Sequence, residues 1–325
     1  MPHFTTRILR AELAHRDECI AFGKCAASKW PDSQAGTMAV GTGAVVYMGP
    51  GMYVNRAIGL GLEHFDVGVS PSNQVAKRDP TESFDIGDPS NQMSDDEPTD
   101  VPAESFESQI ERIEAFCAER NLAPEIQICD RGSEHLVAVL TARGYTLQSR
   151  RNVHLYVPDT EASTSTLDVD DEPSDLGQPL RDDPMDPRDF RIEAVDEALF
   201  PNWRDVHSEG FTSGSAAKQT NDLFCEVAHA VPEAEDFVAL LGDVPVAVAS
   251  LVTFDGVAWL GGMATRPAYR RRGFQAALLR HRIAHALSSG SDLVVTSTDP
   301  ESASERNVIR AGFRPLYVQL TYVRS

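Results

Sequence analysis

The chain has 325 residues, 42% of them hydrophobic, which is enough for about two domains with a sizeable core. No apolar run reaches the roughly 18–20 residues that cross a membrane, and the net charge of −20 disfavours a nucleic-acid partner because phosphate binding needs a basic face. The five cysteines are scattered without a C-x-x-C pair and the N-terminus has no signal-peptide pattern, so we expect a cytoplasmic protein without disulfides or a zinc site.

Apolar spacing and turn residues predict alternating helices and strands in the first 157 residues. Phe106, Ile110, Ile113 and Phe116, for example, recur every three or four residues, as on one face of a helix. In chain order we expect a helix over 8–28, strands over 37–48 and 52–62, a helix over 105–120, a strand over 124–129, a helix over 133–143 and one or two strands over 145–157.

Two segments hold most of the negative charge. Residues 71–104 contain nine Asp or Glu and two Lys or Arg, and residues 158–189 contain eleven and two. Both are rich in Pro, Ser, Thr and Asp, so neither can bury enough apolar area to offset the entropy of ordering. We expect an acidic insertion at 71–104 and an acidic linker at 158–189.

The remaining residues, 190–325, predict a second series of elements. We expect a strand over 190–194, helices over 199–211 and 215–230, strands over 237–242, 244–253 and 257–265, a helix over 273–287, a strand over 293–297, a helix over 302–311 and one or two closing strands over 313–324. Residues 124–145 and 293–314 both run strand, short helix, Arg-Gly-Tyr or Arg-Ala-Gly-Phe, which indicates a weak internal duplication.

The turn between the strand 257–265 and the helix 273–287 carries Arg270, Arg271, Arg272 and Gly273. The first N–H groups of a helix have no intrahelical partner and lie at the positive end of its dipole. With a glycine that allows close approach, and with basic side chains, such a turn can bind a phosphate. It is neither a Walker A loop nor a dinucleotide fingerprint, and a solvated arginine cluster on an ordinary turn is the structural alternative.

The stretch Arg270-Arg271-Arg272-Gly273-Phe274-Gln275, followed by Ala-Ala-Leu-Leu, resembles the acyl-CoA-binding signature Arg/Gln-x-x-Gly-x-Gly/Ala of the GNAT superfamily of N-acyltransferases. Ala311-Gly312-Phe313 resembles the Gly-Phe that the superfamily places after its fourth helix. The resemblance implies an α/β (α+β) fold with two GNAT-like modules, each a mixed, mostly antiparallel central sheet flanked by helices. It implies a degenerate module at 1–157 that contains the insertion, the linker at 158–189, and an acyl-CoA-binding catalytic module at 190–325.

The same resemblance implies a cofactor site for acetyl-CoA. The strand before the turn would splay from its neighbour and pair through the backbone of Met263, Ala264 and Thr265 with the pantetheine arm. The pyrophosphate would lie on backbone amides of Arg271, Arg272, Gly273, Phe274, Gln275 and Ala276, and Asn307 would also contact the cofactor. Gln275 departs from the small residue of the signature, and its side chain either crowds the pyrophosphate or adds a contact to it.

The catalytic residues are unknown from the sequence, because Val308 stands where the superfamily often has a thiolate-protonating tyrosine and Thr296 falls near its usual glutamate base. Glu301 occupies the position of a common cofactor-contacting asparagine. The remaining candidates for proton transfer are Glu209, His207, Asp255, Asp299 and Tyr322. His281 and His285 lie four residues apart without a carboxylate or cysteine nearby in sequence, so no metal site is expected.

Taken together, these features predict an N-acetyltransferase that transfers an acetyl group from acetyl-CoA to an amine, that of a small molecule rather than of a protein, by direct attack in a ternary complex. One alternative is a catalytically silent acyl-CoA-binding sensor or scaffold, which the replacements at Val308 and Thr296 favour. Another is a domain that binds a different phosphorylated ligand. The sequence leaves the acceptor and the oligomeric state open.

Overall fold

A computed structural model describes residues 2–63, 65, 104–158, 190–211 and 214–324. The predicted acidic linker, apart from Pro158, and the predicted acidic insertion, apart from Glu104, lie outside these residues. Among the residues described, no helix combines the length and the apolar character needed to cross a membrane.

The helices and strands follow the predicted order closely. The helices are α1 (Pro2–Lys29), η1 (Pro31–Ser33), α3 (Phe106–Glu119), α4 (Glu134–Ala142), α6 (Phe200–Phe211), α7 (Ser215–His229), η2 (Pro267–Tyr269), α8 (Phe274–Ser288) and α9 (Ala303–Arg310). The strands are β1 (Gly36–Val40), β2 (Gly43–Tyr47), β3 (Arg56–Ile58), β4 (Glu125–Cys129), β5 (Thr146–Tyr156), β6 (Phe190–Ala194), β7 (Ala234–Leu241), β8 (Val244–Phe254), β9 (Val257–Thr265), β10 (Leu293–Thr298) and β11 (Phe313–Val323).

Two predictions in the first half are wrong. The strand predicted over 37–48 is a hairpin, because Gly41 adopts φ +53° and the chain reverses between Val40 and Gly43. The strand predicted over 52–62 shrinks to β3, since Gly59 and Gly61 both adopt positive φ and end the extended backbone.

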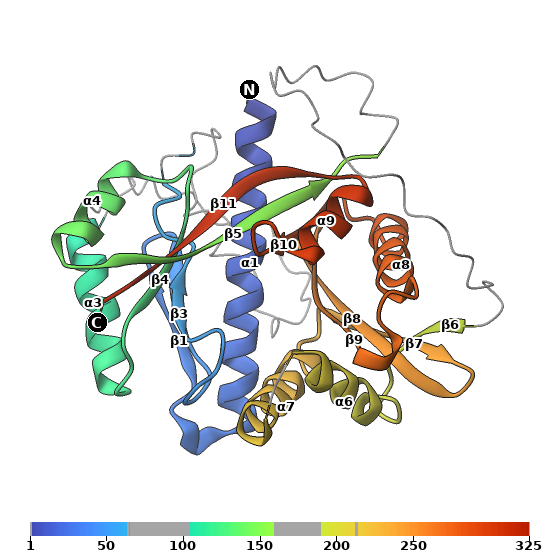
Figure 1. Ribbon diagram of the computed structural model, residues 1–325. Coiled ribbons are helices and arrows are strands. Elements are labelled where there is room, and N and C mark those ends of the chain that lie inside the picture. The colour runs from blue at the N-terminus through green and yellow to red at the C-terminus, as the bar shows by residue number, and fades with distance from the viewer. Residues whose placement is uncertain (1, 64, 66–103, 159–189, 212–213, 325) are drawn as a thin grey trace, which may run out of the picture.

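All described strands belong to one mixed, mostly antiparallel sheet with the order β1-β2-β3-β4-β11-β5-β10-β9-β8-β7-β6. The predicted fold class, an α/β fold with mostly antiparallel sheets flanked by helices, is confirmed. The two halves of the chain meet at β5 and β11, which pair with each other from Phe313↔Tyr156 to Val323↔Thr146 and cross the middle of the molecule (Figure 1).

The last strand of each half is inserted among the strands of the other half. β5, from the first half, separates β10 from β11, and β11, from the second half, separates β4 from β5. The chain accordingly ends beside α3, where Arg324 pairs with Glu114 (Figure 1). Each half therefore completes its part of the sheet with a strand from the other.

The helices cover both faces of the sheet. Side chains of α1 pack with Val153, Leu155, Val257 and Val295 on one face, where α6 and α7 also lie. The opposite face is covered by α3 and α4 in the first half and by α8 and α9 in the second. Because α1 contacts β8, β9 and β10 as well as β1 and β2, it joins the two halves on its face.

Candidate active site

The predicted splay of the strand before the arginine turn is confirmed by the strand register. β9 pairs in parallel with β10 only from Val257↔Leu293 to Leu260↔Thr296. Beyond this point β10 continues along β5, from Val295↔Leu155 to Thr298↔Asn152, while β9 continues along β8 alone. Residues Gly261–Thr265 therefore present one backbone edge that has no neighbouring strand among the residues described.

A bulge in the β8–β9 pairing marks the start of this free edge. The register shifts between Val248 and Ser250, which lie opposite Ala264 and Gly261. Gly262 adopts φ +56°, and a Cβ built on it would lie 2.6 Å from Ser250 Oγ. Glycine is therefore required at Gly262 by its backbone conformation and by the close side chain.

Arg282 of α8 supports the bulge from the face of the sheet that α8 covers. Its Nη1 donates to the carbonyls of Ser250 at 2.6 Å and Gly261 at 2.8 Å, one on each strand. The side chain is buried, and no carboxylate among the described residues pairs with it. Burial lowers the pKa of Arg282 to about 9, so the guanidinium remains charged at neutral pH. Sequence reasoning missed it, although an arginine between Leu278, Leu279 and Ile283 was a visible interruption of an apolar stripe.

The arginine turn runs from η2 into α8 with open backbone amides. Arg271 adopts φ 61° and Gly273, the N-cap residue, φ +84°. No atom lies within 4 Å of a Cβ built on Gly273, whereas the next side chain, Phe274, is buried in the core and anchors the helix. Arg271 and Arg272 are exposed, with Arg272 over the ring of Tyr269. The first turn of α8 therefore offers unpaired N–H groups beside positive side chains, as an anion site requires.

Two of the predicted cofactor residues contact each other between α8 and α9. Asn307 Nδ2 donates to Gln275 Oε1 at 2.7 Å. Both side chains are partly exposed, so the pair lies at the surface between the two helices. Because the Gln275 carbonyl oxygen is occupied, its amide NH₂ remains available as a donor beside the turn.

The structure explains why the two departures from the superfamily pattern cannot transfer protons. Val308 is buried in the core between α9 and α8. Thr296 is buried too, and its Oγ1 donates to Leu260 O at 2.8 Å, at the last β9–β10 pair. Glu301 lies in the turn before α9 with φ 59°, where its N–H donates to Glu305 Oε2.

Two of the candidate proton-transfer residues, Asp255 and Tyr322, lie away from the splayed strands, whereas His207 lies on α6, which packs against β8 and β9. Asp255 is in the turn before β9, at the opposite end of that strand from the arginine turn. Tyr322 belongs to the core of the first half. His207 is buried between α6 and α7, 3.0 Å from Asn221 Nδ2 and 3.3 Å from Cys225 Sγ, and burial lowers its pKa to about 4. For Asp255 and Tyr322, spacing along the chain did not show which end or face of the sheet each residue occupies.

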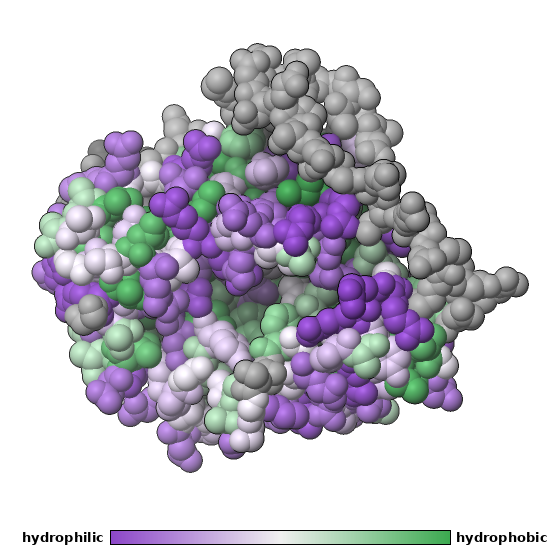
Figure 2. Space-filling view, viewed as in Figure 1, coloured by the Kyte–Doolittle hydropathy of each residue, from purple (hydrophilic) through white to green (hydrophobic). Residues whose placement is uncertain are grey.

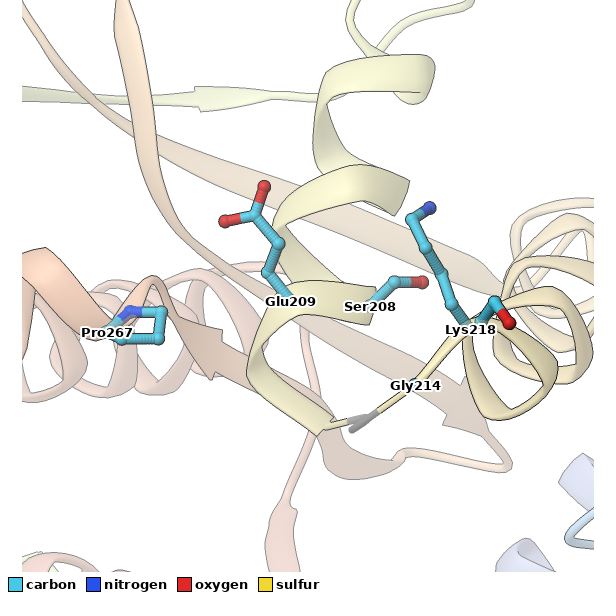
Figure 3. Close-up of a pocket in the computed structure, with 6 residues that line it drawn as sticks. Ser208, Glu209, Gly214, Lys218 and Pro267 are labelled. Atoms are coloured by element: carbon cyan, nitrogen blue, oxygen red, sulfur yellow. The ribbon is translucent and has the colours of Figure 1, made fainter.

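Asp299 and Glu209 are nearer to the gap. Asp299 follows β10 and forms a long ion pair with Arg151 of β5, at 3.8 Å. Glu209 lines a pocket of about 350 Å³ between the end of α6, the start of α7 and the turn after β9, together with Ser208, Gly214, Ser215, Lys218 and Pro267 (Figure 3). In the close-up, Ser208 and Lys218 lie between the two helices and Glu209 extends on the side nearer Pro267.

This pocket adjoins the free edge of β9. A Cβ built on Gly210, the residue after Glu209, would lie 2.5 Å from Ala264 Cβ, so α6 runs directly against the strand. Glu209 is half exposed and lies 3.4 Å from Arg266 Nε. In the view of Figure 2 the molecular surface is hollowed near its centre. A ligand that reaches the gap from this side would meet a carboxylate first.

The described residues contain no group of three or more His, Cys, Asp or Glu side chains that could hold a metal ion. His281 and His285 stack on each other, and His285 Nε2 lies 2.8 Å from Glu235 Oε2. The five cysteines are all free thiols, four of them buried.

Comparison with known proteins gives a family match in the second half of the chain. Residues 195–313 match the model of the acetyltransferase (GNAT) family. No curated protein matches.

Among solved structures, a GCN5-related N-acetyltransferase from Kribbella flavida has a TM-score of 0.53 at 15% identity, covering 94% of this chain and 95% of that one. A GCN5-related N-acetyltransferase from Sphaerobacter thermophilus covers 66% of each chain at 14% identity with a TM-score of 0.45. A tandem GNAT protein from the clavulanic acid biosynthesis pathway covers 66% of this chain and 67% of its own at 12% identity, also with a TM-score of 0.45. The first of these likenesses shows that the fold extends over both halves.

Proposed function

Given that residues 195–313 make this chain a member of the GNAT acetyltransferase superfamily, we propose that it transfers the acetyl group of acetyl-CoA to the amine of a small molecule. The observation that carries the proposal is the free edge of β9 beside the open first turn of α8. One site binds an extended amide chain and the other binds a phosphate, and acetyl-CoA joins both groups in one molecule.

In this proposal the backbone of Met263, Ala264 and Thr265 pairs with the pantetheine arm as an added strand would. The pyrophosphate binds the amides from Arg271 to Ala276, and the amide NH₂ of Gln275, held by Asn307, donates to it. The thioester then lies in the gap between β9 and β10. A backbone N–H on the free edge of β9 stabilises the oxyanion that forms when the amine attacks.

The acceptor enters from the face that carries α6 and α7. The pocket beside Ala264 offers Glu209 as a carboxylate for an ammonium group, and it opens next to the gap. The first module, residues 1–157, serves a structural role in this cytoplasmic enzyme, because its β5 and α1 complete the sheet and cover the face of the second module, residues 190–325. Residues 158–189 link the two.

Thermal unfolding with acetyl-CoA, CoA or ADP tests the cofactor site, using Gly273→Glu and a matched control. A ligand at a hundredfold excess over its Kd stabilises the native state by about 2.7 kcal/mol. Gly144 has φ +83° and equally open surroundings at the end of α4, so Gly144→Glu imposes the same backbone strain away from the site. We expect acetyl-CoA and CoA to stabilise the wild type and Gly144→Glu but not Gly273→Glu. Stabilisation of all three proteins alike would contradict the assignment.

A silent acyl-CoA-binding sensor is the second candidate, and the burial of Val308 at the usual tyrosine position favours it. Release of CoA from acetyl-CoA with a panel of amines separates the two functions. Binding without release of CoA for any amine would support the sensor.

A further inference from the structure

A buried carboxylate lies close to the splayed strands on the acceptor face. Asp236 of β7 is 7% exposed and accepts hydrogen bonds from two side chains. Ser250 Oγ donates to its Oδ1 at 2.6 Å, and His229 Nδ1 lies 2.7 Å from its Oδ2. Because a carboxylate only accepts, both neighbours donate, and the three side chains form a continuous chain from β8 through β7 to the end of α7.

The inner end of this chain is at the bulge. Strand alternation places Ser250 on the same face as Val248, which packs against α6. Ser250 lies opposite Gly261, and its Oγ occupies the space where a side chain at Gly262 would be. Ser250, Gly261 and Gly262 are all partly exposed although they lie in the interior of the sheet, so a ligand at the gap can reach the hydroxyl.

The outer end of the chain is near the surface. The side chain of His229 is 28% exposed and stacks on Phe200 with ring centroids 4.1 Å apart. This stacking and the bond to Asp236 fix the imidazole, which in turn holds the carboxylate with Oδ1 toward Ser250.

We propose that Ser250 and Asp236 take the proton from the acceptor ammonium, with His229 as a positioning residue. This assignment rests on the proposed acetyltransferase function. An N–H bond of the ammonium breaks as an O–H bond forms on Ser250, whose own proton moves to Asp236 Oδ1. The neutral amine uses the freed electron pair to attack the thioester carbonyl. A second N–H proton transfers to the CoA thiolate, which leaves as the thiol. Asp236 returns its proton to solvent after the amide departs.

The arrangement supplies a base, which Thr296, near the position of the usual glutamate, cannot be. Ser250 Oγ lies 2.6 Å from Asp236 Oδ1, which is within the range for proton transfer between the hydroxyl and the carboxylate. Arg282 binds the carbonyl of the same Ser250 from the other face, so the serine is fixed through its backbone as well as its side chain.

The test compares Ser250→Ala and Asp236→Asn with Glu235→Gln in the full-length protein. Glu235 is the adjacent residue of β7, faces the opposite side of the sheet and also pairs with a histidine, His285. CoA release is measured with acetyl-CoA and two classes of acceptor: alkyl amines, which are ammonium ions at neutral pH, and aromatic amines or alkoxyamines, which are already neutral. Only the first class needs the proton removed.

We expect Ser250→Ala and Asp236→Asn to lower kcat by about a hundredfold with alkyl amines and by less than about threefold with neutral amines. The KM for acetyl-CoA and the rates of Glu235→Gln should stay near those of the wild type. Equal losses with both acceptor classes, or no loss, would overturn the assignment, because a structural role does not distinguish them. A wild type that binds acetyl-CoA but acetylates no amine refutes the proposed function itself, and this inference with it. Ser250→Ala keeps the test valid if Asp236→Asn fails to fold.

Discussion

At the scale of single residues, the guanidinium of Arg282 is subject to two opposing free-energy terms. Its burial without a carboxylate costs several kcal/mol, whereas the two bulge carbonyls would each lose roughly 1–3 kcal/mol without a donor. These terms partly cancel in Arg282→Met, so we expect the free energy of unfolding in urea to change by less than about 2 kcal/mol. We expect kcat to fall by about tenfold or more, since the bulge is no longer fixed.

Arg280→Met is the control for this prediction, because Arg280 is exposed on the same helix. It should change both the stability and the turnover little. A large loss of stability in Arg282→Met with normal turnover of the folded molecules would show that the guanidinium supports only the fold.

Gln275 is the second residue whose role can be measured. Its Oε1 is bonded to Asn307, which leaves the NH₂ group to donate to the pyrophosphate. We therefore expect Gln275→Ala to raise the Kd for acetyl-CoA by about tenfold, the equivalent of one hydrogen bond to a charged group. Gln275→Glu keeps the shape and replaces the donor by a negative charge, so calorimetry should show a larger loss. Tighter binding by Gln275→Ala would mean that the glutamine crowds the cofactor.

Residue identity alone predicted what Val308 and Thr296 cannot do, because a valine has no proton to transfer whatever its place in the fold. It could not identify Asp236, since one aspartate among 49 acidic residues carries no mark in the sequence. Asp236 became a candidate only when the β7–β8 register brought Ser250 beside it and the end of α7 brought His229.

At the scale of elements, the sequence predicted the helices and long strands well because their signals are local. Ser133 caps the start of α4 and Gly144 adopts positive φ after its end, and both features are determined by residues close to these positions in the sequence. The pairing of β5 with β10 and of β11 with β4 joins residues more than a hundred positions apart. No local pattern specifies which of two similar closing strands lies beside which neighbour, so this exchange was not predictable.

The short helix α9 gives a prediction at this scale, because it carries both Asn307 and Val308. Ser302 is its N-cap, and its Oγ accepts from Glu305 N at 3.1 Å. Ser302→Ala removes this bond and should cost about 1 kcal/mol, lowering the Tm and weakening acetyl-CoA binding slightly as Asn307 loses its fixed position. Ser304→Ala, one residue inside the same helix, is the matched control and should have little effect on either. Equal shifts in the two variants would show that the cap does not stabilise α9.

At the scale of the whole molecule, the exchange of β5 and β11 makes the sheet continuous across the two halves. Neither half has a complete sheet without a strand from the other, and α1 covers strands of both. A separate second module would lack β5 between β10 and β11. The two modules are therefore proposed as units of ancestry and function. We expect the entire chain to unfold as one cooperative unit.

Cooperative unfolding tests this conclusion. Val153 lies on β5, is fully buried, and packs with Val257, Trp259 and Val295 from the second half. Val153→Ala should cost about 2–3 kcal/mol from lost burial and the cavity left behind. Trp30 lies in the first half and Trp203 and Trp259 lie in the second, so single-tryptophan variants report on each half separately. We expect one urea transition at the same midpoint for every reporter, moved to lower urea as a unit by Val153→Ala.

Leu136→Ala extends the test to a buried side chain of α4, whose hydrophobic cluster is built mainly from the first half and includes Leu320 and Tyr322 of β11 from the second. If the halves unfold together, it lowers the midpoint seen by Trp259 as much as the midpoint seen by Trp30. Acetyl-CoA bound to the second half should likewise slow amide exchange in β4, because a ligand that binds only the native state protects every segment that opens by global unfolding. Separate midpoints, or protection confined to β8, β9 and β10, would show that the shared strands join two units that unfold independently.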